Sequence, residues 1–398
     1  MIDSEAVLGL PGYEVISIDR NGGEVTISAR YTGPISCPHC AGTGLRSKGR
    51  YVRVVRHESM GTRRCWLAVE AHKFQCRGCG RGFRQRFPGV LPRARASERL
   101  RREVFLDHWD GVSRSRISQR QRIGSATVER WFQHCLRRVV AERSDAVCPR
   151  VLGIDEHFFS RRKGFATTFC NLENHTVYDV VAGRSEAALE PYLRNLKGKQ
   201  EVRVVCMDLS STYRALVRKH FPHARIVADR FHVIRLVLQQ FLACWKTLDP
   251  VGAKNRGLLS LLRRHRRNLK PDQRRRVRDY FARNPAIEAV WRVKETLSWI
   301  LLRKHRTKRQ CARLVPRFLR ILEQLRACPF APLATLGDTL HNWAEQIVPM
   351  WRFTRNNGIT EGFHTRIEVL QRQAYGFRNF ANYRMRVRAM CSRAVPRF

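Results

Sequence analysis

The chain has 398 residues, of which 76 are Lys or Arg and 33 are Asp or Glu, giving a formal net charge of +43 at pH 7. This excess of positive charge favours nucleic acid as the partner, because each neutralised phosphate releases condensed counterions. An anionic membrane is the disfavoured polyanion, because no apolar stretch reaches the roughly 18 residues of a membrane span and residues 1–5 are acidic where an export signal would be basic.

The 13 cysteines are an odd number in a long chain without an evident export signal. This usage predicts reduced thiols in a cytoplasm rather than a disulfide framework. Four cysteines cluster in CxxC pairs. Isolated ones such as Cys135, Cys170 and Cys206 lie in apolar surroundings and are expected to be small core residues.

Prolines divide the chain into segments of different composition. Boundaries are expected at Leu91-Pro92 and Cys148-Pro149, because the residue before a proline disfavours the helical conformation. Residues 1–95 are rich in glycine, short strands and paired cysteines, and residues 96–147 are basic and helical. Residues 148–398 begin with alternating strands and helices, and become almost entirely helical over about 235–350.

Two CxxC pairs are the strongest motif of the first segment. The runs Cys37-Pro38-His39-Cys40 and Cys76-Arg77-Gly78-Cys79 supply four thiolates, the ligand set of a closed, structural zinc site. The 35 residues between the pairs exceed the usual spacing, and strand-like runs at 50–56 and 65–74 would fill this gap as the hairpin of a zinc ribbon. His39 or Cys65 as a substitute ligand, and four cysteines without metal, are the alternatives.

Residues 97–140 have the pattern of a helix-turn-helix. One helix is expected from Ser97, a second over 113–121, a turn at Arg122-Ile123-Gly124, and a third helix from the capping residue Ser125. A plain helical linker is the alternative. Arginines of this motif would face DNA phosphates or base edges. The predicted DNA-binding residues are Arg120, Arg122, Arg130 and Arg137.

The next segment alternates between strands and helices. Three leading strands followed by helix, strand, helix and strand is the order of a ribonuclease-H-like sheet. The strands are expected at 151–155, 165–171, 175–182, 202–208 and 225–229, and the helices at 185–196 and 211–220.

Carboxylates end two apolar runs of this segment. Asp155 closes the run 151–155 and Asp208 closes the run 204–208. Acids at the ends of neighbouring strands can share divalent cations, and two-metal phosphoryl transfer needs carboxylates that hold the metals roughly 3.5–4 Å apart. In so basic a chain these acids are better explained as metal ligands facing a phosphodiester than as surface charge. Glu156 faces the other side of the strand by alternation.

Three acids compete for the place of the third ligand, and spacing alone leaves the choice open. Glu361 opens a helix whose apolar stripe can pack on the sheet while its polar stripe meets the two aspartates. Glu368 on the same helix and Asp229 at a strand end are the rivals. The polar stripe contains Asn357, Glu361, His364 and Glu368, and the apolar stripe contains Ile359, Phe363, Ile367 and Leu370.

Dense arginine runs occupy the helical stretch between Asp229 and Glu361. A solvated helix face is the simple explanation, but few acids balance these runs, so tracking of the DNA backbone is expected as well. The predicted contacts are Arg263, Arg264, Arg266 and Arg267, with a second run at 274–276. The tryptophans at positions 245, 291, 299, 343 and 351 are expected to be core residues, although one could stack on an unpaired base.

With these motifs in place, the chain resembles the ISL-three family of insertion-sequence transposases over nearly its whole length. The resemblance rests on the double CxxC head, the run Gly153-Ile154-Asp155-Glu156, Met207-Asp208 with Tyr213, and residues 227–232. Its most specific stretch is 357–364, followed by 375–380.

The resemblance implies a multidomain α/β protein: a zinc-ribbon domain (1–95), a helix-turn-helix domain (96–147) and a ribonuclease-H-like DDE catalytic domain (148–398) with a large all-helical insertion. Asp155, Asp208 and Glu361 then become a catalytic triad that holds two Mg²⁺, or Mn²⁺. The implied function is that of a DNA transposase of a prokaryotic cytoplasm, associated with the nucleoid. It would bind the inverted-repeat ends of its element, cleave them to free a 3′-hydroxyl and join that end to target DNA, working as a homodimer or a larger assembly.

One residue departs from the family, which usually has Asn where His364 stands. This leaves the three acids untouched but leaves the role of this position open. Two other functions remain at this stage: a catalytically inert DNA-binding regulator derived from a transposase, and a packaging protein that binds DNA by charge alone.

Overall fold

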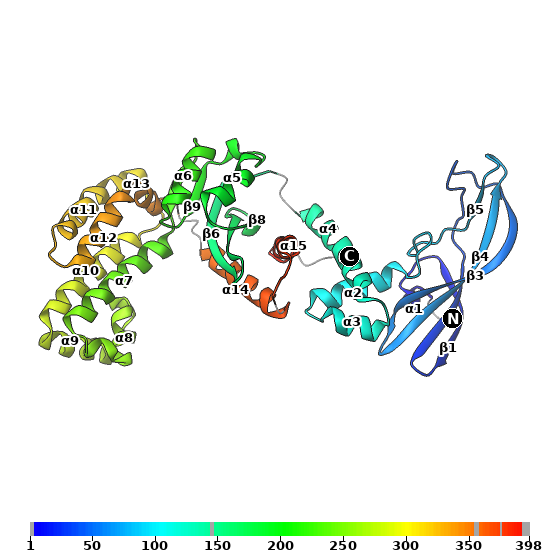
Figure 1. The fold of residues 1–398 in the computed structure, drawn as a ribbon, viewed down its shortest axis with the longest axis horizontal. Coiled ribbons are helices and arrows are strands. Elements are labelled where there is room, and N and C mark those ends of the chain that lie inside the picture. Colours follow the sequence, from blue (N-terminus) through cyan, green and yellow to red (C-terminus); the bar gives the residue numbers. More distant parts are fainter. Residues whose placement is uncertain (1–3, 144–146, 354–357, 375, 392–398) are drawn as a thin grey trace. The chain divides into compact units, whose positions relative to one another are not determined.

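The computed structural model describes residues 4–143, 147–353, 358–374 and 376–391 (Figure 1). The described residues form two compact units: one contains those up to residue 141, and the other contains those from residue 142 onward. Within the described ranges, every helix is either too short or too polar to cross a lipid bilayer.

A five-stranded sheet forms the centre of the first unit. Its order is β1–β2–β4–β3, with β5 paired to β4 outside that path; β2 and β4 run parallel and the other pairs antiparallel. Alternate residues such as Val25, Ile27, Leu67 and Val69 point into one buried core. The elements are α1 (Ser4–Leu8), β1 (Tyr13–Asn21), β2 (Glu24–Tyr31), β3 (Leu45–Met60), β4 (Arg63–Cys76) and β5 (Gly82–Arg84).

Strands β3 and β4 form the hairpin predicted between the two cysteine pairs. Their pairing runs from Met60 and Arg63 at the turn to Leu45 and Cys76 at the far end. The hairpin prediction is confirmed, but both strands extend well beyond the runs 50–56 and 65–74. The ladder continues through polar residues because backbone groups, rather than apolar side chains, make its hydrogen bonds.

Three helices follow the sheet at the predicted places: α2 (Glu98–Trp109), α3 (Arg114–Gln121) and α4 (Ser125–Arg143). Ser97 and Ser113 cap the first two through their side chains. The prediction of Ser125 as a cap was wrong. The amides of Thr127 and Val128 donate to the carbonyl of Gly124, so helical bonding already starts there. The left-handed residue of the turn is Arg122, at φ 45°.

Buried polar contacts join these helices to the sheet. Arg56 of β3 donates to the backbone oxygen and the side-chain oxygen of Gln121, at 2.9 and 3.1 Å. The ring of His57 shares a hydrogen bond of 2.9 Å with the hydroxyl of Ser97. Loss of one buried partner leaves the other unsatisfied, at a cost of about 1–3 kcal/mol. These contacts make the sheet and the helices one unit.

The sheet of the second unit has the order β10–β9–β6–β7–β8. Strands β6, β7 and β8 pair antiparallel, and β9 and β10 run parallel to β6. All the strands and helices predicted between residues 151 and 229 are present. They are β6 (Val151–Ser160), β7 (Gly164–Asn171), β8 (Thr176–Ala182), α5 (Glu186–Arg194), β9 (Val204–Met207), α6 (Ser211–His220) and β10 (Arg225–Ala228).

One boundary differs in a way that matters for the site. The first strand was predicted to stop at Asp155, whereas β6 continues to Ser160. The parallel pairing with β9 does end just before Asp155, at Ile154 and Met207. The antiparallel pairing with β7 goes on, with Glu156 opposite Thr167. Asp155 therefore lies inside a strand, at the point where one of its two neighbours stops.

The stretch after β10 is almost entirely helical, as predicted. Four of its tryptophans are buried, whereas Trp299 is 40% exposed. The helices are α7 (Arg230–Leu248), α8 (Arg256–Arg263), α9 (Pro271–Arg283), α10 (Pro285–Leu301), α11 (Lys308–Arg326), α12 (Ala331–Asn342), α13 (Ala344–Ile347), α14 (Gly358–Gln373) and α15 (Phe380–Met390). Short 3-10 turns at Lys199–Glu201, Gly252–Lys254, Arg266–Asn268 and Val348–Trp351 complete the unit.

Helices α14 and α15 return to the sheet. Phe363, Ile367 and Leu370 of α14 are buried in one cluster with residues of β6, β7 and β8. This confirms the predicted apolar stripe for these three residues, while the side chain of Ile359 lies outside the described part of the structure. The side chain of Arg384 in α15 donates to Asp179 of β8 at 2.6 Å. The last helices thus close one face of the site-bearing sheet.

Candidate functional site

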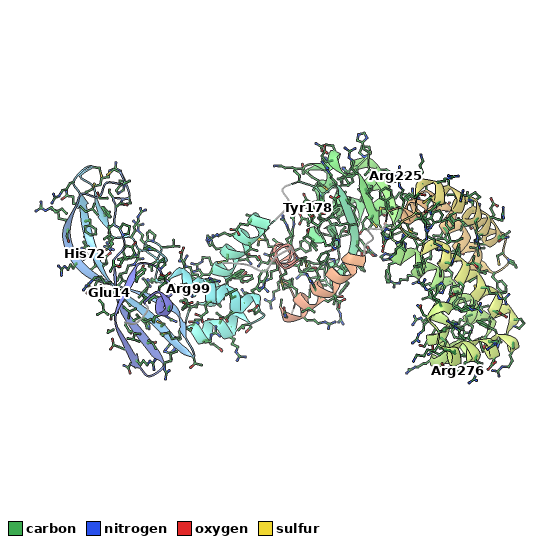
Figure 2. The ribbon with its side chains drawn as sticks, turned by 180° about the vertical axis from the view of Figure 1, so that it is seen from behind. Glu14, His72, Arg99, Tyr178, Arg225 and Arg276 are labelled. Atoms are coloured by element: carbon green, nitrogen blue, oxygen red, sulfur yellow. The ribbon has the colours of Figure 1, made fainter. Side chains whose placement is uncertain are left out.

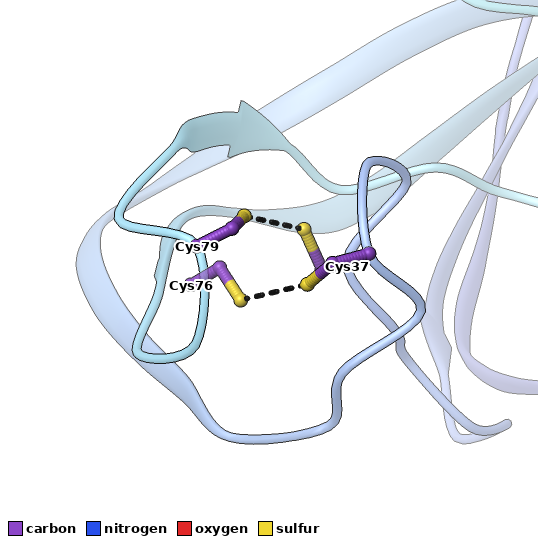
Figure 3. Close-up of side chains that lie close together, drawn as sticks. Cys37, Cys76 and Cys79 are labelled. Carbon is purple, nitrogen blue, oxygen red and sulfur yellow. Dashed lines mark hydrogen bonds between the residues drawn. The ribbon is translucent and has the colours of Figure 1, made fainter.

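The four predicted cysteines lie together at the end of the β3–β4 hairpin (Figure 3). Their Sγ atoms all lie within 4.8 Å of one another. The Sγ atoms of Cys37 and Cys79 are 3.6 Å apart, and those of Cys40 and Cys76 are 3.5 Å apart. Four thiolates at about 2.3 Å from a central zinc ion would have nearly this separation. The cysteines therefore fit a closed tetrahedral zinc site.

Backbone hydrogen bonds shape both cysteine turns. The amide of Ala41 donates to the carbonyl of Cys37, and the amide of Gly80 donates to that of Cys76. A hydrogen bond from the backbone of Cys79 lowers the pKa of the Cys76 thiol to about 7, which favours the thiolate that binds metal. Neither alternative ligand belongs to the cluster among the described residues, and Cys65 is buried in the sheet core.

The parallel pairing of three strands of the second unit stops at one level of the sheet. Ile154 of β6 pairs with Met207 of β9, which in turn pairs with Ala228 of β10. Each of these residues is followed directly by an aspartate, and the three are Asp155, Asp208 and Asp229. The sheet therefore brings three acids from distant parts of the sequence to one edge.

Two of these acids, Asp155 and Asp208, have raised pKa values. Burial raises the pKa of Asp155 to about 7, and the charges of Asp208 and Asp229 add to this effect while that of His232 opposes it. Burial likewise raises the pKa of Asp208 to about 6. One oxygen of Asp208, Oδ1, is buried without a hydrogen-bond partner among the described residues. Crowded carboxylates with an unused oxygen suit a hard divalent cation.

Asp229 differs from the other two because its oxygens already have partners. It caps α7 by accepting from the amide of Phe231, and its Oδ2 lies 2.7 Å from Nδ1 of His232. The hydrogen bond to Asp229 raises the pKa of His232, and the charges of Asp155 and Asp208 act in the same direction. His232 is a site residue that the sequence analysis missed. Its spacing of three residues from a helix-capping Asp is the signal that could have revealed it.

Helix α14 lies beside Asp155. Nδ1 of His364 is 3.9 Å from Oδ2 of Asp155, and Nε2 of His364 is buried without a partner among the described residues. Burial lowers the pKa of His364 to about 4, so its ring is neutral near pH 7. Glu361 lies three residues earlier in the same helix, but its side chain is outside the described part of the structure, as are residues 357 and 375.

A cavity of about 610 Å³ separates β6 from the later turns of α14. Its lining includes Glu156, His157 and His364, and Glu368 at its rim. Glu368 is exposed and forms an ion pair with Arg372 at 3.4 Å, one turn further along the helix. Glu156 forms an ion pair of 2.9 Å with Arg184. Both acids thus form ion pairs, whereas Asp208 forms none among the described residues.

The arginines predicted to bind DNA lie on the surface of their units. The side chains at positions 122, 130, 137, 263, 264, 266 and 267 are exposed. Arg120 is also exposed, but it forms an ion pair with Asp107 and lies 3.6 Å from Glu103. The charge of Arg120 is therefore partly compensated within its own unit. Contact of any of these residues with DNA stays a prediction.

Known transposases are similar in sequence to both parts of this chain. Residues 152–387 match the sequence model of a transposase family, the ISL3 transposases. Residues 33–79 match the zinc finger of the IS204, IS1001, IS1096 and IS1165 transposases. The transposase for insertion sequence element IS1001 from Bordetella parapertussis is 23% identical over 408 residues, which cover 98% of each chain.

The matched range 152–387 contains Asp155, Asp208, Asp229 and α14, and the range 33–79 contains all four clustered cysteines. The first match alone covers more than half of the 398 residues. The chain therefore belongs to the ISL3 family of transposases.

Proposed function

We propose that this DNA transposase cuts and joins DNA strands at a divalent-metal site formed by Asp155, Asp208 and Glu361. The observation that carries the proposal is the common register of β6 and β9, which brings two aspartates with raised pKa values to one sheet edge. A cation between them would offset the repulsion that raises those pKa values. The metal we propose is Mg²⁺, or Mn²⁺, as expected for oxygen ligands.

The catalytic domain is, in this proposal, ribonuclease-H-like, with the helices α7 to α13 inserted between β10 and α14. An antiparallel meander of three strands, followed by two parallel strands added beside the first one, supports this assignment. The first strand then lies at the centre of the sheet, with Asp155 at the position where its parallel neighbour ends.

Glu361 is the third ligand that the described contacts support best. His364 on the following turn of α14 approaches Asp155, and residues three apart lie on the same side of a helix. Asp229 already caps α7 and lies in hydrogen-bond contact with His232, and Glu368 is exposed and paired with Arg372. These partners leave both rivals less suited to hold a cation.

A pair of bound divalent cations would supply Lewis-acid stabilisation of the attacking and leaving oxygens of a phosphodiester. The chain's own contribution is to orient the ligands. The amide of Glu156 donates to Oδ1 of Asp155 at 2.8 Å and leaves Oδ2 directed toward α14. His232, held by Asp229, adds positive character beside both aspartates. This arrangement would favour the ionised carboxylates that metal binding requires.

Binding of the element's ends is assigned in this proposal to the first unit. Helices α3 and α4 would form a helix-turn-helix in which α4 enters the major groove and exposes Arg130 and Arg137. The exposed arginines 263–267 of the second unit would follow the DNA backbone. Figure 2 shows the side chains of this helical part, with Arg276 of the second arginine run on α9.

The test is cleavage of a duplex that carries the end of the element, with Mg²⁺ or Mn²⁺ present. We expect Asp155→Asn and Asp208→Asn each to lower the rate of strand cleavage by about a thousandfold or more, because each removes a charge that holds the metals. Binding of the same duplex should change by less than about twofold. Glu368→Gln is the matched control and should cut like the unaltered protein. Full cleavage by either aspartate variant would refute the assignment.

A further inference from the structure

A groove of about 1120 Å³ lies on the first unit, on the inner side of the β3–β4 hairpin. It is lined by residues of the first cysteine turn, of β3, β4 and β5, and of the segment 85–94. We call it the ribbon groove. Its charged lining residues are Lys48, Arg53, Lys73, Arg84, Arg86 and Arg93.

The strand register places three of these cations, Arg53, Lys73 and Arg84, on one face. Residues opposite each other in an antiparallel ladder share a face, and Tyr51 pairs with Ala71, Arg53 with Val69. Val69 and Ala71 belong to the buried core. Toward the cysteine turns, the same face of the hairpin no longer covers the core. There Lys73 of β4 lies opposite Arg84 of β5, and both residues line the groove.

The lining of the ribbon groove contains six cations and no carboxylate. The opposite face of the hairpin is different. There Glu70 forms an ion pair of 2.8 Å with Arg30, and Arg50 contributes a second positive charge beside it. A concave surface that carries only positive charge attracts a polyanion such as the phosphate backbone of DNA. A surface whose charges are paired does not.

The aromatic rings of the groove are already packed. Phe74 lies 5.6 Å from the ring of His72 and 5.7 Å from that of Phe83, and the guanidinium of Arg84 lies 6.0 Å from the ring of Tyr51. A protein that stacks unpaired bases presents open ring faces. The rings of this groove are partly buried and already have neighbours, whereas most of its cations are exposed. The groove therefore favours phosphates over bases, and a duplex over a single strand.

We propose that the ribbon groove binds the sugar-phosphate backbone of duplex DNA. It is a contact surface in addition to α4 and to the arginines of the second unit, and it rests on the proposed function because the duplex would be an end of the element. The zinc site would stabilise one wall of this groove. Pro38 and His39 of the first cysteine turn line the groove, so zinc would fix one wall of it.

Arg53 has a structural part that sets it apart from the other five cations. Its guanidinium donates to the backbone oxygens of Leu91 and Ala94, at 2.7 and 3.3 Å. It therefore holds the segment 91–94 against the hairpin and is unsuitable for substitution. Lys48, Lys73 and Arg86 are exposed and can be neutralised without removing these bonds.

The experiment uses the full, zinc-loaded chain and a fluorescent DNA duplex of mixed sequence about three helical turns long. Affinity is measured by anisotropy over a series of salt concentrations. For the triple variant Lys48→Gln, Lys73→Gln and Arg86→Gln, we expect the slope of log K against log salt to fall in magnitude by about 2 to 3, with affinity about 10- to 100-fold lower at physiological salt. Lys73→Gln alone should lower the slope by about 1, which keeps the test valid should the triple variant fold poorly.

The matched control removes three exposed arginines of the same unit outside the groove: Arg20→Gln, Arg50→Gln and Arg63→Gln. A small and equal loss for both triples would overturn the proposal, since it would show a general charge effect. Unchanged binding by the groove triple, with weaker binding by Arg130→Gln and Arg137→Gln, would overturn the groove but keep DNA binding by α4. Tighter binding of an RNA duplex or a single strand would also overturn it. Failure of the unaltered protein to bind any duplex would instead refute the proposed function.

Discussion

The cysteine cluster and the aspartate cluster are built in opposite ways. Two tight turns bring four sulfur atoms together, and a backbone hydrogen bond in one turn lowers the pKa of the Cys76 thiol to about 7. The aspartates converge from strands far apart in the sequence, and burial raises the pKa values of Asp155 and Asp208 to about 7 and about 6. At Cys40 a backbone hydrogen bond from Gly42 lowers the pKa, but hydrogen bonds with the thiols of Cys76 and Cys79 raise it to about 12. The first site therefore favours the thiolate of Cys76 before any ion arrives, whereas burial at the second site opposes ionisation of both aspartates.

In the proposed function, this difference would separate a structural centre from a catalytic one. A tetrahedral site with four thiolates leaves no open position, so its binding energy contributes to folding. The proposed carboxylate site keeps one oxygen, Oδ1 of Asp208, without a partner among the described residues, together with a repulsion that a cation would relieve. Its metal would therefore exchange more readily and could also meet a substrate. The predictions below ask whether the two centres differ in this way.

Removal of zinc should have the largest effect. Structural zinc contributes about 10 kcal/mol or more to the folding of small zinc domains. We expect Cys76→Ser, or a strong chelator, to abolish the unfolding transition of the first unit while that of the second unit remains. Differential scanning calorimetry of the full chain would measure this. Cys328→Ser, outside the cluster, is the control; equal melting curves for the two cysteine variants would contradict the structural role.

Neutralising Asp155 should stabilise the metal-free second unit. A pKa of about 7 in the folded chain, against 3.8 in the unfolded chain, corresponds to a penalty of up to about 4 kcal/mol at pH 8. Asp155→Asn removes this penalty together with cleavage. Urea unfolding at pH 8 without divalent ions is the measurement, and Glu368→Gln is the control. A clear loss of stability in Asp155→Asn would show that its charge is not repelled in the free protein.

The stability of the metal-free second unit should fall as pH rises from 6.5 to 8. The raised pKa values of Asp155, Asp208 and His232 mean that the folded state binds more protons than the unfolded chain in this range. Below pH 6.5 the lowered pKa values of His157 and His364, about 3 and about 4, act in the opposite direction. Melting temperatures at both pH values would measure this. Mg²⁺ should remove most of the fall, and a fall of the same size with Mg²⁺ would count against a metal site.

The smallest effect is expected in the helical segment. Arg266→Gln with Arg267→Gln should reduce the salt slope of duplex binding by about 2, with no change in zinc content. Arg292→Gln with Arg326→Gln is the matched control, since these exposed arginines already pair with Glu288 and Asp338. Equal slopes for the two double variants would remove residues 266 and 267 from the proposed DNA path.

Local patterns predicted much of this fold. The cysteine spacing predicted the two cysteine turns. Helix starts were predicted correctly at residues 97, 113 and 185, where serines cap the observed helices. The stripe of Phe363, Ile367 and Leu370 correctly predicted that α14 packs on the sheet. These features succeed because each is encoded within a few residues, through backbone geometry or helical periodicity.

Features that depend on distant partners escaped prediction. The strand β6 continues past Asp155 because β7 pairs with it, which no local signal at residues 156–160 reveals. The role of His232 requires Asp155 and Asp208 to arrive from other strands. The ribbon groove likewise arises only when the hairpin, β5 and the segment 85–94 come together. Tertiary contacts decide such features, and spacing alone does not encode them.

The most direct test of the central claim is a titration with Mn²⁺, followed by electron paramagnetic resonance, of the protein bound to a duplex end. We expect Mn²⁺ binding to be lost in the double variant Asp155→Asn, Asp208→Asn, to be weakened about tenfold or more in Glu361→Gln, and to stay unchanged in Glu368→Gln. Undiminished Mn²⁺ binding by the double aspartate variant would contradict the account, because the ions would then be held elsewhere in the molecule.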